Sequence, residues 1–147
     1  MRVLLVCLGN ICRSPLAESA LRRALEAAGV ADVEVDSAGT AVWCPGEAPD
    51  VRMAAAAREF GLDLRGAARQ VTVEDFATAD LLVAMDRRNL AELQRLAPDD
   101  PARARIRLYL DEAEVPDPFL GEATFAEVAQ LTIAAADKLA TSLRERP

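Results

Sequence analysis

Short apolar runs alternate along this chain with segments whose apolar residues recur at helical spacing. The first run, within residues 2–7, is rich in β-branched residues, which is typical of a strand buried on both faces. The predicted strands are residues 2–7, 33–35, 81–85 and 106–110. Strands that alternate with helices in this way predict a parallel sheet with helices on both faces. The fold class is therefore α/β, and the 147 residues fit one doubly wound domain over residues 1–147.

The predicted helices are marked by their caps as well as by their periodicity. Ser14 followed by proline is typical of an N-cap and a first helical residue. The last helix opens with a capping box at Thr124. Its buried face is expected to comprise Val128, Leu131, Ala135 and Leu139. The predicted helices are residues 14–28, 50–60, 86–97 and 124–139, with a short helical turn from residue 72.

The chain contains no histidine, and its formal net charge is −7. The first fact excludes Ser-His and Cys-His catalysis, phosphohistidine chemistry and zinc sites that use imidazole. The acidic charge disfavours a nucleic-acid partner, because such binding depends on Lys and Arg. The longest apolar run is too short to span a bilayer, so no membrane partner is expected. Three cysteines at unlike spacings suit a reducing compartment, and a cytoplasmic location is predicted.

The segment from Cys7 to Ser14 lies between the first predicted strand and the first predicted helix. A tight turn that contains Gly9 and leads into a helix N-terminus directs several backbone N–H groups into one concavity, which is an anion site. These amides and the guanidinium of Arg13 favour the thiolate form of Cys7. Arg13 is also able to hold two phosphate oxygens in a fork. The segment therefore predicts a cysteine nucleophile directed at a bound phosphate.

A leaving alkoxide or phenoxide needs a proton, and without histidine the donor must be a carboxylic acid. Asp117 is the candidate, because the prolines on either side stiffen its loop. It follows the fourth predicted strand, so it reaches the same edge of the sheet as Cys7. No cluster of metal-ligand spacing is visible, and neither a metal nor a cofactor is expected.

Four motifs together resemble the low molecular weight protein tyrosine phosphatases. The motifs are residues 7–15, residues 36–40, the segment 84–86 with Asn89, and residues 117–121. The resemblance runs from Met1 into the last helix. It implies a four-stranded parallel sheet of the flavodoxin-like, phosphatase I type and a metal-free mechanism through a cysteinyl phosphate. It also implies phosphotyrosine-containing proteins as substrates. Inorganic phosphate or vanadate is expected to bind the anion site competitively, and the protein is expected to be a monomer.

The resemblance assigns roles to individual residues. Cys7 matches the nucleophile, Arg13 the phosphate clamp and Asp117 the general acid, which later acts as base. Ser14 matches the hydroxyl that stabilises the departing thiolate. The phosphate-binding loop is expected to comprise Leu8, Gly9, Asn10, Ile11 and Cys12, with Asn10 holding its shape and Ser37 hydrogen-bonding to Asn10. The aromatic walls of the substrate slot are matched by Trp43 and Phe119.

Departures from the family pattern occur at three places. Gly66 stands where members often have a histidine, so support of the phosphate loop by an imidazole is absent. Phe119-Leu120 replaces the two tyrosines that many members have, so regulation by phosphorylation of that pair does not apply. Cys44 beside Trp43 is unusual, and the sequence assigns it no role.

The resemblance also implies a redox pairing of Cys7 with Cys12. An oxidised Cys7 would then be protected as a disulfide from further oxidation. The alternative is that Cys12 only packs beneath the loop.

Three other functions on the same fold remain as alternatives. Protein-arginine phosphatases tend to have Thr where this chain has Ile11, and a bulky apolar side chain favours an aromatic leaving group. Arsenate reductases add a resolving pair of cysteines, whereas no cysteine follows Cys44. A phosphocysteine phosphoryl carrier needs no general acid, so Asp117 argues against that function.

Overall fold

The computed structural model describes all residues from Met1 to Pro147. The strands are β1 (Arg2–Cys7), β2 (Glu34–Gly39), β3 (Leu81–Ala84) and β4 (Ile106–Leu108). The helices are α1 (Arg13–Ala27), α2 (Val51–Arg58), α3 (Val73–Thr78), α4 (Arg87–Leu96), α5 (Asp100–Arg103) and α6 (Phe125–Arg144). A 3₁₀ turn, η1, spans Pro118–Leu120.

The sheet has four strands in the order β2-β1-β3-β4, and every neighbouring pair is parallel. The predicted α/β class and the four-stranded parallel sheet are confirmed. The chain moves outward from β1 in both directions, to β2 on one side and to β3 on the other. Ligands of such folds bind beyond the carboxyl end of the strand where the order reverses. Cys7, the last residue of β1, lies at that point, paired with Gly39 of β2.

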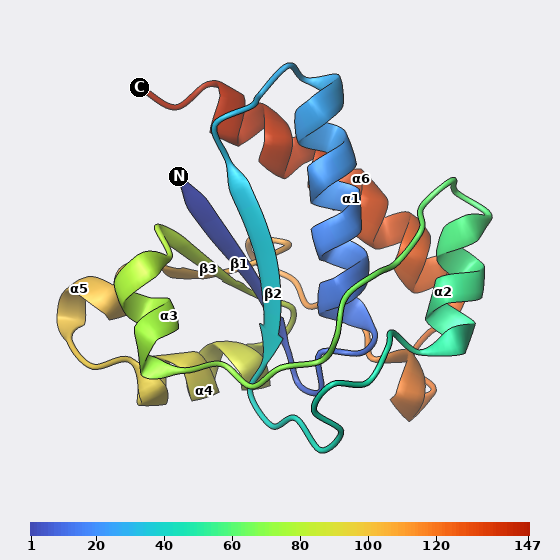
Figure 1. Cartoon of the computed structure of the whole chain (residues 1–147), viewed down its shortest axis with the longest axis horizontal. Helices are drawn as coiled ribbons and strands as arrows, with labels where there is room; N and C mark the ends of the chain where they lie inside the picture. Colours follow the sequence, from blue (N-terminus) through green and yellow to red (C-terminus); the bar gives the residue numbers. More distant parts are fainter.

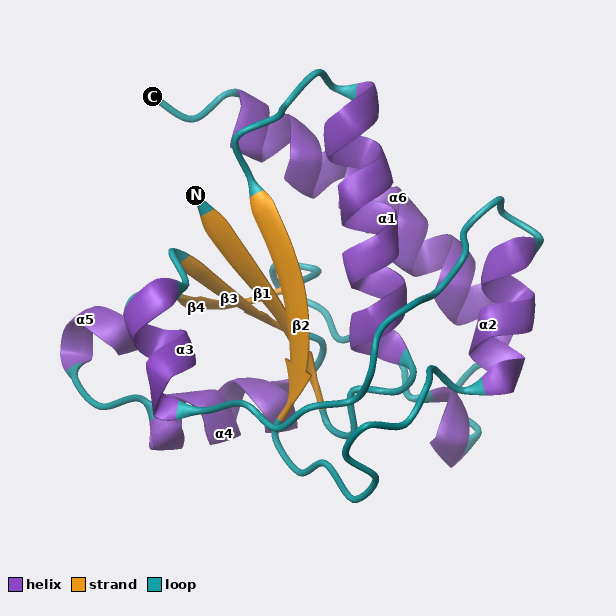
Figure 2. Cartoon of the chain, in the orientation of Figure 1, coloured by secondary structure: helices purple, strands orange, loops and turns teal.

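Helices cover both faces of the sheet, as Figures 1 and 2 show. On one face, α1, α2 and α6 pack together over a core that includes Leu5, Leu16 and Met53. On the other face, α3, α4 and α5 enclose a smaller core around Leu4 and Phe76. Residues 3–6 of β1 are completely buried between the two cores. The strand that ends at Cys7 is therefore held firmly from both faces.

Helix α1 begins earlier than its cap signal indicates. The helix starts at Arg13 with Cys12 as its N-cap, and no side chain caps it. The prediction that Ser14 is the N-cap was therefore wrong. The Ser14 hydroxyl lies instead against Cys7 Sγ and the Asn10 amide, which leaves the helix amides without a side-chain cap.

Other boundaries and one buried position also differ from the prediction. Strand β2 continues to Gly39, because its pairing with β1 extends to that residue. Strand β4 ends at Leu108, and Leu110 forms only an isolated bridge with Ala113. Leu131 was predicted to be buried, but it is 38% exposed on the outer side of α6. None of the helices combines the length and the apolar composition that a membrane span requires.

Candidate active site

Residues 8–12 turn from the end of β1 into the start of α1. Asn10 has a left-handed backbone with φ 56°, which tightens this turn. None of the backbone N–H groups of residues 8–12 donates a hydrogen bond to a protein acceptor. Unpaired amides in a largely buried segment are rare in folded proteins. Together with the N-terminus of α1, they form a site that favours an anion.

The thiol of Cys7 faces a serine hydroxyl. Cys7 Sγ lies 3.0 Å from Ser14 Oγ, and both side chains are buried. Asn10 Nδ2 donates a hydrogen bond of 2.9 Å to the same Ser14 oxygen. The Ser14 hydroxyl has two acceptors within reach of its proton, Cys7 Sγ at 3.0 Å and the carbonyl oxygen of Ala38 at 3.4 Å, and the shorter contact is the one to Cys7. The arrangement stabilises negative charge on Cys7 Sγ.

Asn10 joins the turn to two neighbouring segments. Its Nδ2 also donates to Ser37 Oγ at 3.0 Å, and its Oδ1 accepts a hydrogen bond of 3.0 Å from the backbone N–H of Arg69. Ser37 in turn donates to Glu18 Oε1 at 2.6 Å. Burial raises the pKa of Glu18, against the opposing effect of the Ser37 hydrogen bond. These contacts support the turn on the side where Gly66 offers no side chain.

The turn also depends on a close approach of two backbones. A Cβ built on Gly39 would lie 2.6 Å from the carbonyl oxygen of Leu8 and 3.1 Å from the amide nitrogen of Asn10. Any side chain at this position would push the turn away from β2. Gly39 is therefore needed for the shape of the phosphate-binding loop.

Arg13 is buried and is held from one side. Its Nη1 donates to Asp86 Oδ2 at 2.8 Å and to the carbonyl oxygen of Val115 at 3.0 Å. Burial acts to lower the pKa of Arg13, but the charges of Cys7, Asp86 and Asp117 raise it above its usual value. The guanidinium therefore stays charged, and Nη2 remains for a ligand.

Asp117 lies at the rim of the same site, at the N-cap of η1. Its Oδ2 is 3.7 Å from Arg13 Nη2, and its Oδ1 accepts a hydrogen bond of 3.0 Å from the backbone N–H of Phe119. Arg13 and Asp117 both line a cleft of about 660 Å³, together with Leu8 and other residues. The structure thus brings Asp117 into the neighbourhood of the phosphate-binding loop, 110 positions after Cys7.

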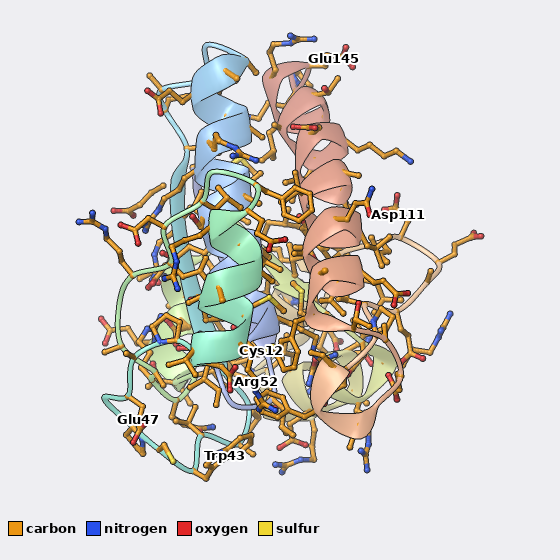
Figure 3. The ribbon with its side chains drawn as sticks, turned by 90° about the vertical axis from the view of Figure 1, so that its right-hand side faces the viewer. Cys12, Trp43, Glu47, Arg52, Asp111 and Glu145 are labelled. Atoms are coloured by element: carbon orange, nitrogen blue, oxygen red, sulfur yellow. The ribbon has the colours of Figure 1, made fainter.

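Exposed apolar side chains lie in the phosphate-binding loop, against it and in the turn that bears Asp117. Trp43 is 57% exposed and lies against Gly9, where a built Cβ would be 2.5 Å from the indole ring. Leu8, Phe119 and Leu120 are also exposed. Figure 3 shows Trp43 at the same end of the molecule as Cys12. Trp43 is not a core aromatic, so its exposed ring is free to contact a substrate.

Cys12 is buried at the N-terminus of α1, and all three cysteines are free thiols. Burial raises the pKa of Cys12, and the nearby charges of Cys7 and Asp50 raise it further. Cys12 therefore remains protonated at neutral pH. Ile11 contributes its carbonyl oxygen, which accepts a hydrogen bond of 2.7 Å from the backbone N–H of Asp50.

Two residues at the site were missed by the sequence analysis. Asp86 was interpreted as a helix cap and as part of a family motif, with no role at the site, yet its second carboxylate oxygen holds Arg13. Glu18 lies on α1 within reach of Ser37, and nothing in its local pattern indicates that contact. No group of three or more His, Cys, Asp or Glu side chains that could hold a metal ion is present.

Comparisons with known proteins agree with this geometry. A sequence model described as low molecular weight phosphotyrosine protein phosphatase matches residues 2–147. The low molecular weight protein-tyrosine-phosphatase of Streptomyces coelicolor is 41% identical over 155 residues, which cover 99% of this chain and 94% of that protein.

Solved structures of phosphatases share this fold over nearly the whole chain. A protein tyrosine phosphatase from Entamoeba histolytica, with Hepes in its active site, superimposes with a TM-score of 0.92 at 33% identity and covers 99% of this chain and 97% of that one. The arginine phosphatase YwlE from Bacillus subtilis, in a variant with a phosphorylated active-site serine, gives a TM-score of 0.88 at 25% identity, with coverage of 99% and 97%.

The family model and the Streptomyces relative both span the chain, and they confirm the resemblance and the hydrolase class predicted from the sequence. The chain belongs to the low molecular weight phosphotyrosine protein phosphatase family.

Proposed function

We propose that this protein hydrolyses phosphotyrosine in proteins, without a metal, through a phosphocysteine at Cys7. The observation that supports this most directly is the loop of residues 8–12, which leads from Cys7 at the end of β1 to the N-terminus of α1 and leaves its backbone N–H groups without a protein acceptor. Such donors stabilise the equatorial oxygens of a phosphoryl group during transfer. Cys7, Arg13 and Asp117 are the proposed catalytic residues.

In the first step, the Cys7 thiolate attacks phosphorus. The S–P bond forms as the P–O bond to the tyrosine ring breaks, and the protonated carboxyl of Asp117 donates its proton to the leaving phenoxide. Arg13 binds two of the phosphoryl oxygens with the N–H groups that Asp86 and Val115 do not use. Tyrosine leaves, and the phosphoryl group remains on Cys7.

In the second step, water attacks the phosphocysteine. The Asp117 carboxylate takes a proton from this water, the new P–O bond forms, and the S–P bond breaks. The departing thiolate receives a hydrogen bond from the Ser14 hydroxyl, 3.0 Å away. Inorganic phosphate is released, Asp117 is again protonated, and the enzyme returns to its starting state.

The apolar rim favours an aromatic substrate. Trp43 presents an exposed ring against Gly9 of the phosphate-binding loop, and Phe119 presents one next to Asp117. Leu8, in the loop itself, is also exposed and lines the cleft. Aromatic side chains prefer stacked or edge-to-face partners, which a phosphotyrosine ring supplies.

A protein-arginine phosphatase is the second candidate, because a relative of that activity shares the fold. Ile11 supports tyrosine as the substrate, since a bulky apolar side chain suits an aromatic ring better than a guanidinium. Arsenate reduction and phosphoryl carriage are weaker candidates. The chain has no resolving pair of cysteines, which argues against an arsenate reductase. Asp117 lies beside Arg13, and a phosphoryl carrier would need no acid there.

The test compares matched peptides that contain phosphotyrosine, phosphoserine or phosphoarginine. We expect hydrolysis of the phosphotyrosine peptide, with competitive inhibition by phosphate and vanadate and the same rate in EDTA. Faster hydrolysis of the phosphoarginine peptide would favour the second candidate, and a rate that depends on metal would contradict the mechanism. We also propose that the protein is cytoplasmic, since its odd number of cysteines suits a reducing compartment. We propose further that it acts as a monomer.

A further inference from the structure

Arg52, in the first turn of α2, lies over the rings of Phe119 and Phe125, which follow it by 67 and 73 positions in the chain. Its guanidinium carbon is 4.8 Å from the centre of the Phe119 ring and 4.7 Å from that of Phe125. The two rings meet edge to face, with centroids 5.9 Å apart. An arginine over an aromatic face at this distance makes a favourable cation–π contact. Figure 3 shows Arg52 near Cys12 at the active-site end of α2.

The other side of Arg52 is tied to the phosphate-binding loop through Asp50. Arg52 Nε and Nη2 lie 3.3 Å and 3.2 Å from the two carboxylate oxygens of Asp50. The backbone N–H of Asp50 donates to the carbonyl oxygen of Ile11 at 2.7 Å. Asp50 also caps α2, which fixes its own position. Arg52 is therefore anchored to the same loop that surrounds the phosphate.

The turn that bears Asp117 has few anchors of its own. Pro118 is the buried residue among positions 117–122, whereas Phe119 is 43% exposed and Leu120 is 64% exposed. The backbone N–H of Asp117 is bonded only to Glu122, within the same turn. A segment with little buried apolar surface is held weakly and opens easily. Contacts from outside the turn therefore decide how well Asp117 is placed.

We propose that Arg52 is a positioning residue for catalysis, which clasps Phe119 and Phe125 and so holds the Asp117 turn against the phosphate-binding loop. The connection is short: Phe119 donates its backbone N–H to Asp117 Oδ1 at 3.0 Å, so a fixed Phe119 fixes the carboxyl group. This inference rests on the proposed function, because it explains how the proposed acid is held in place.

The first test measures kcat/KM of Arg52→Ala on two substrates. Phenyl phosphate releases a poor leaving group that needs the acid, whereas p-nitrophenyl phosphate releases a good one that needs it less. We expect kcat/KM to fall about 5- to 30-fold for phenyl phosphate, which is about 1–2 kcal/mol at 1.36 kcal/mol per tenfold, the sum of two exposed cation–π contacts. For p-nitrophenyl phosphate we expect less than about a twofold loss, with an unchanged inhibition constant for phosphate.

Arg58→Ala is the matched control. Arg58 ends the same helix, is exposed and makes no side-chain hydrogen bond or cation–π contact. It should behave as the unsubstituted protein on both substrates. Arg52→Lys keeps the charge but loses the planar face, so it should restore only part of the loss. Phe125→Leu leaves the Asp50–Arg52 pair intact, and the double variant with Arg52→Ala should lose less than the two single losses multiplied.

Hydrogen exchange gives a readout that does not depend on activity. In Arg52→Ala, the amides of residues 119–121 should exchange faster than in the unsubstituted protein, while those of β1 should not change. Unchanged exchange, or an equal loss on both phenyl substrates, would overturn the inference. If exchange quickens but the unsubstituted protein hydrolyses neither substrate, the clasp stands as a structural contact while the proposed function fails, and with it the positioning role.

Discussion

Replacing Ser14 with alanine separates the two chemical steps. Ser14 Oγ is the donor nearest to Cys7 Sγ, at 3.0 Å, and it is completely buried. A hydrogen bond to a charged group contributes about 1.5–3 kcal/mol. A factor of ten in rate corresponds to about 1.36 kcal/mol. Loss of this hydrogen bond should therefore slow the release of the thiolate from phosphocysteine about 10- to 150-fold.

The first step should respond differently. A thiolate that has lost its donor is less stable but more nucleophilic, so kcat/KM should change little while kcat falls. Phosphocysteine then accumulates, and rapid mixing with p-nitrophenyl phosphate should show a burst of about one p-nitrophenol per enzyme before slow turnover.

Ser19→Ala is the control, because Ser19 lies on the same helix and its hydroxyl makes no hydrogen bond within the protein. It should show kcat and burst amplitude like the unsubstituted protein. A Ser14→Ala enzyme without a burst, with kcat and kcat/KM reduced by the same factor, would refute the role given to this hydroxyl.

Four further predictions concern the proposed acid Asp117, the binding of phosphate, the oxidation of Cys7 and the dependence of stability on pH. Asp117→Asn should lower kcat/KM for phenyl phosphate about 10²–10⁴-fold and that for p-nitrophenyl phosphate much less; equal losses in steady-state assays would show that Asp117 only positions the substrate. Phosphate should raise the Tm of the protein, and Arg13→Lys should lose most of this shift in thermal scans, because lysine lacks the two-pronged donor. Peroxide should inactivate the enzyme in a form that dithiothreitol restores, whereas Cys12→Ser should recover poorly; mass spectra without a Cys7–Cys12 disulfide would contradict the pairing. Burial acts to raise the pKa of Asp75, but hydrogen bonds from a guanidinium and a backbone amide hold it below its usual value. The stability that Asp75 contributes is therefore present above about pH 4 and is lost as the pH falls through the lowered pKa of the folded state. In urea-unfolding measurements between about pH 7 and 2, the free energy of unfolding of Asp75→Asn should fall less steeply towards acid pH than that of the unsubstituted protein. An equally steep fall in both proteins would contradict this.

Local patterns were sufficient for the sheet and for the loop that follows β1. The apolar run that ends at Cys7 and the helical spacing after Arg13 are each visible within a short stretch of sequence. The structure has a strand and a helix at these places. The prediction of Ser14 as the N-cap was wrong because the sequence does not show whether its hydroxyl bonds to a helix amide or to a neighbouring thiol. Only the packing of β1 against α1 decides between them.

Contacts between distant segments were beyond the reach of local patterns. Asp86 has an ordinary capping signal, and its bond to Arg13 joins residues 73 positions apart. The clasp of Arg52 on Phe125 likewise depends on α2 and α6 packing on the same face of the sheet. The short helix α5 was missed although Asp99 caps it, because its four residues are too few to show periodicity.

The contact between Gly9 and Trp43 has a consequence for how such a site changes in evolution. A methyl group at position 9 would occupy space within 2.5 Å of the indole ring, so the two positions share one volume. We expect natural substitutions at them to be coupled, with a side chain at position 9 tolerated only where position 43 has lost its large ring. The size of the aromatic ring that the slot accepts would then depend on residues 9 and 43 together and not on either one alone.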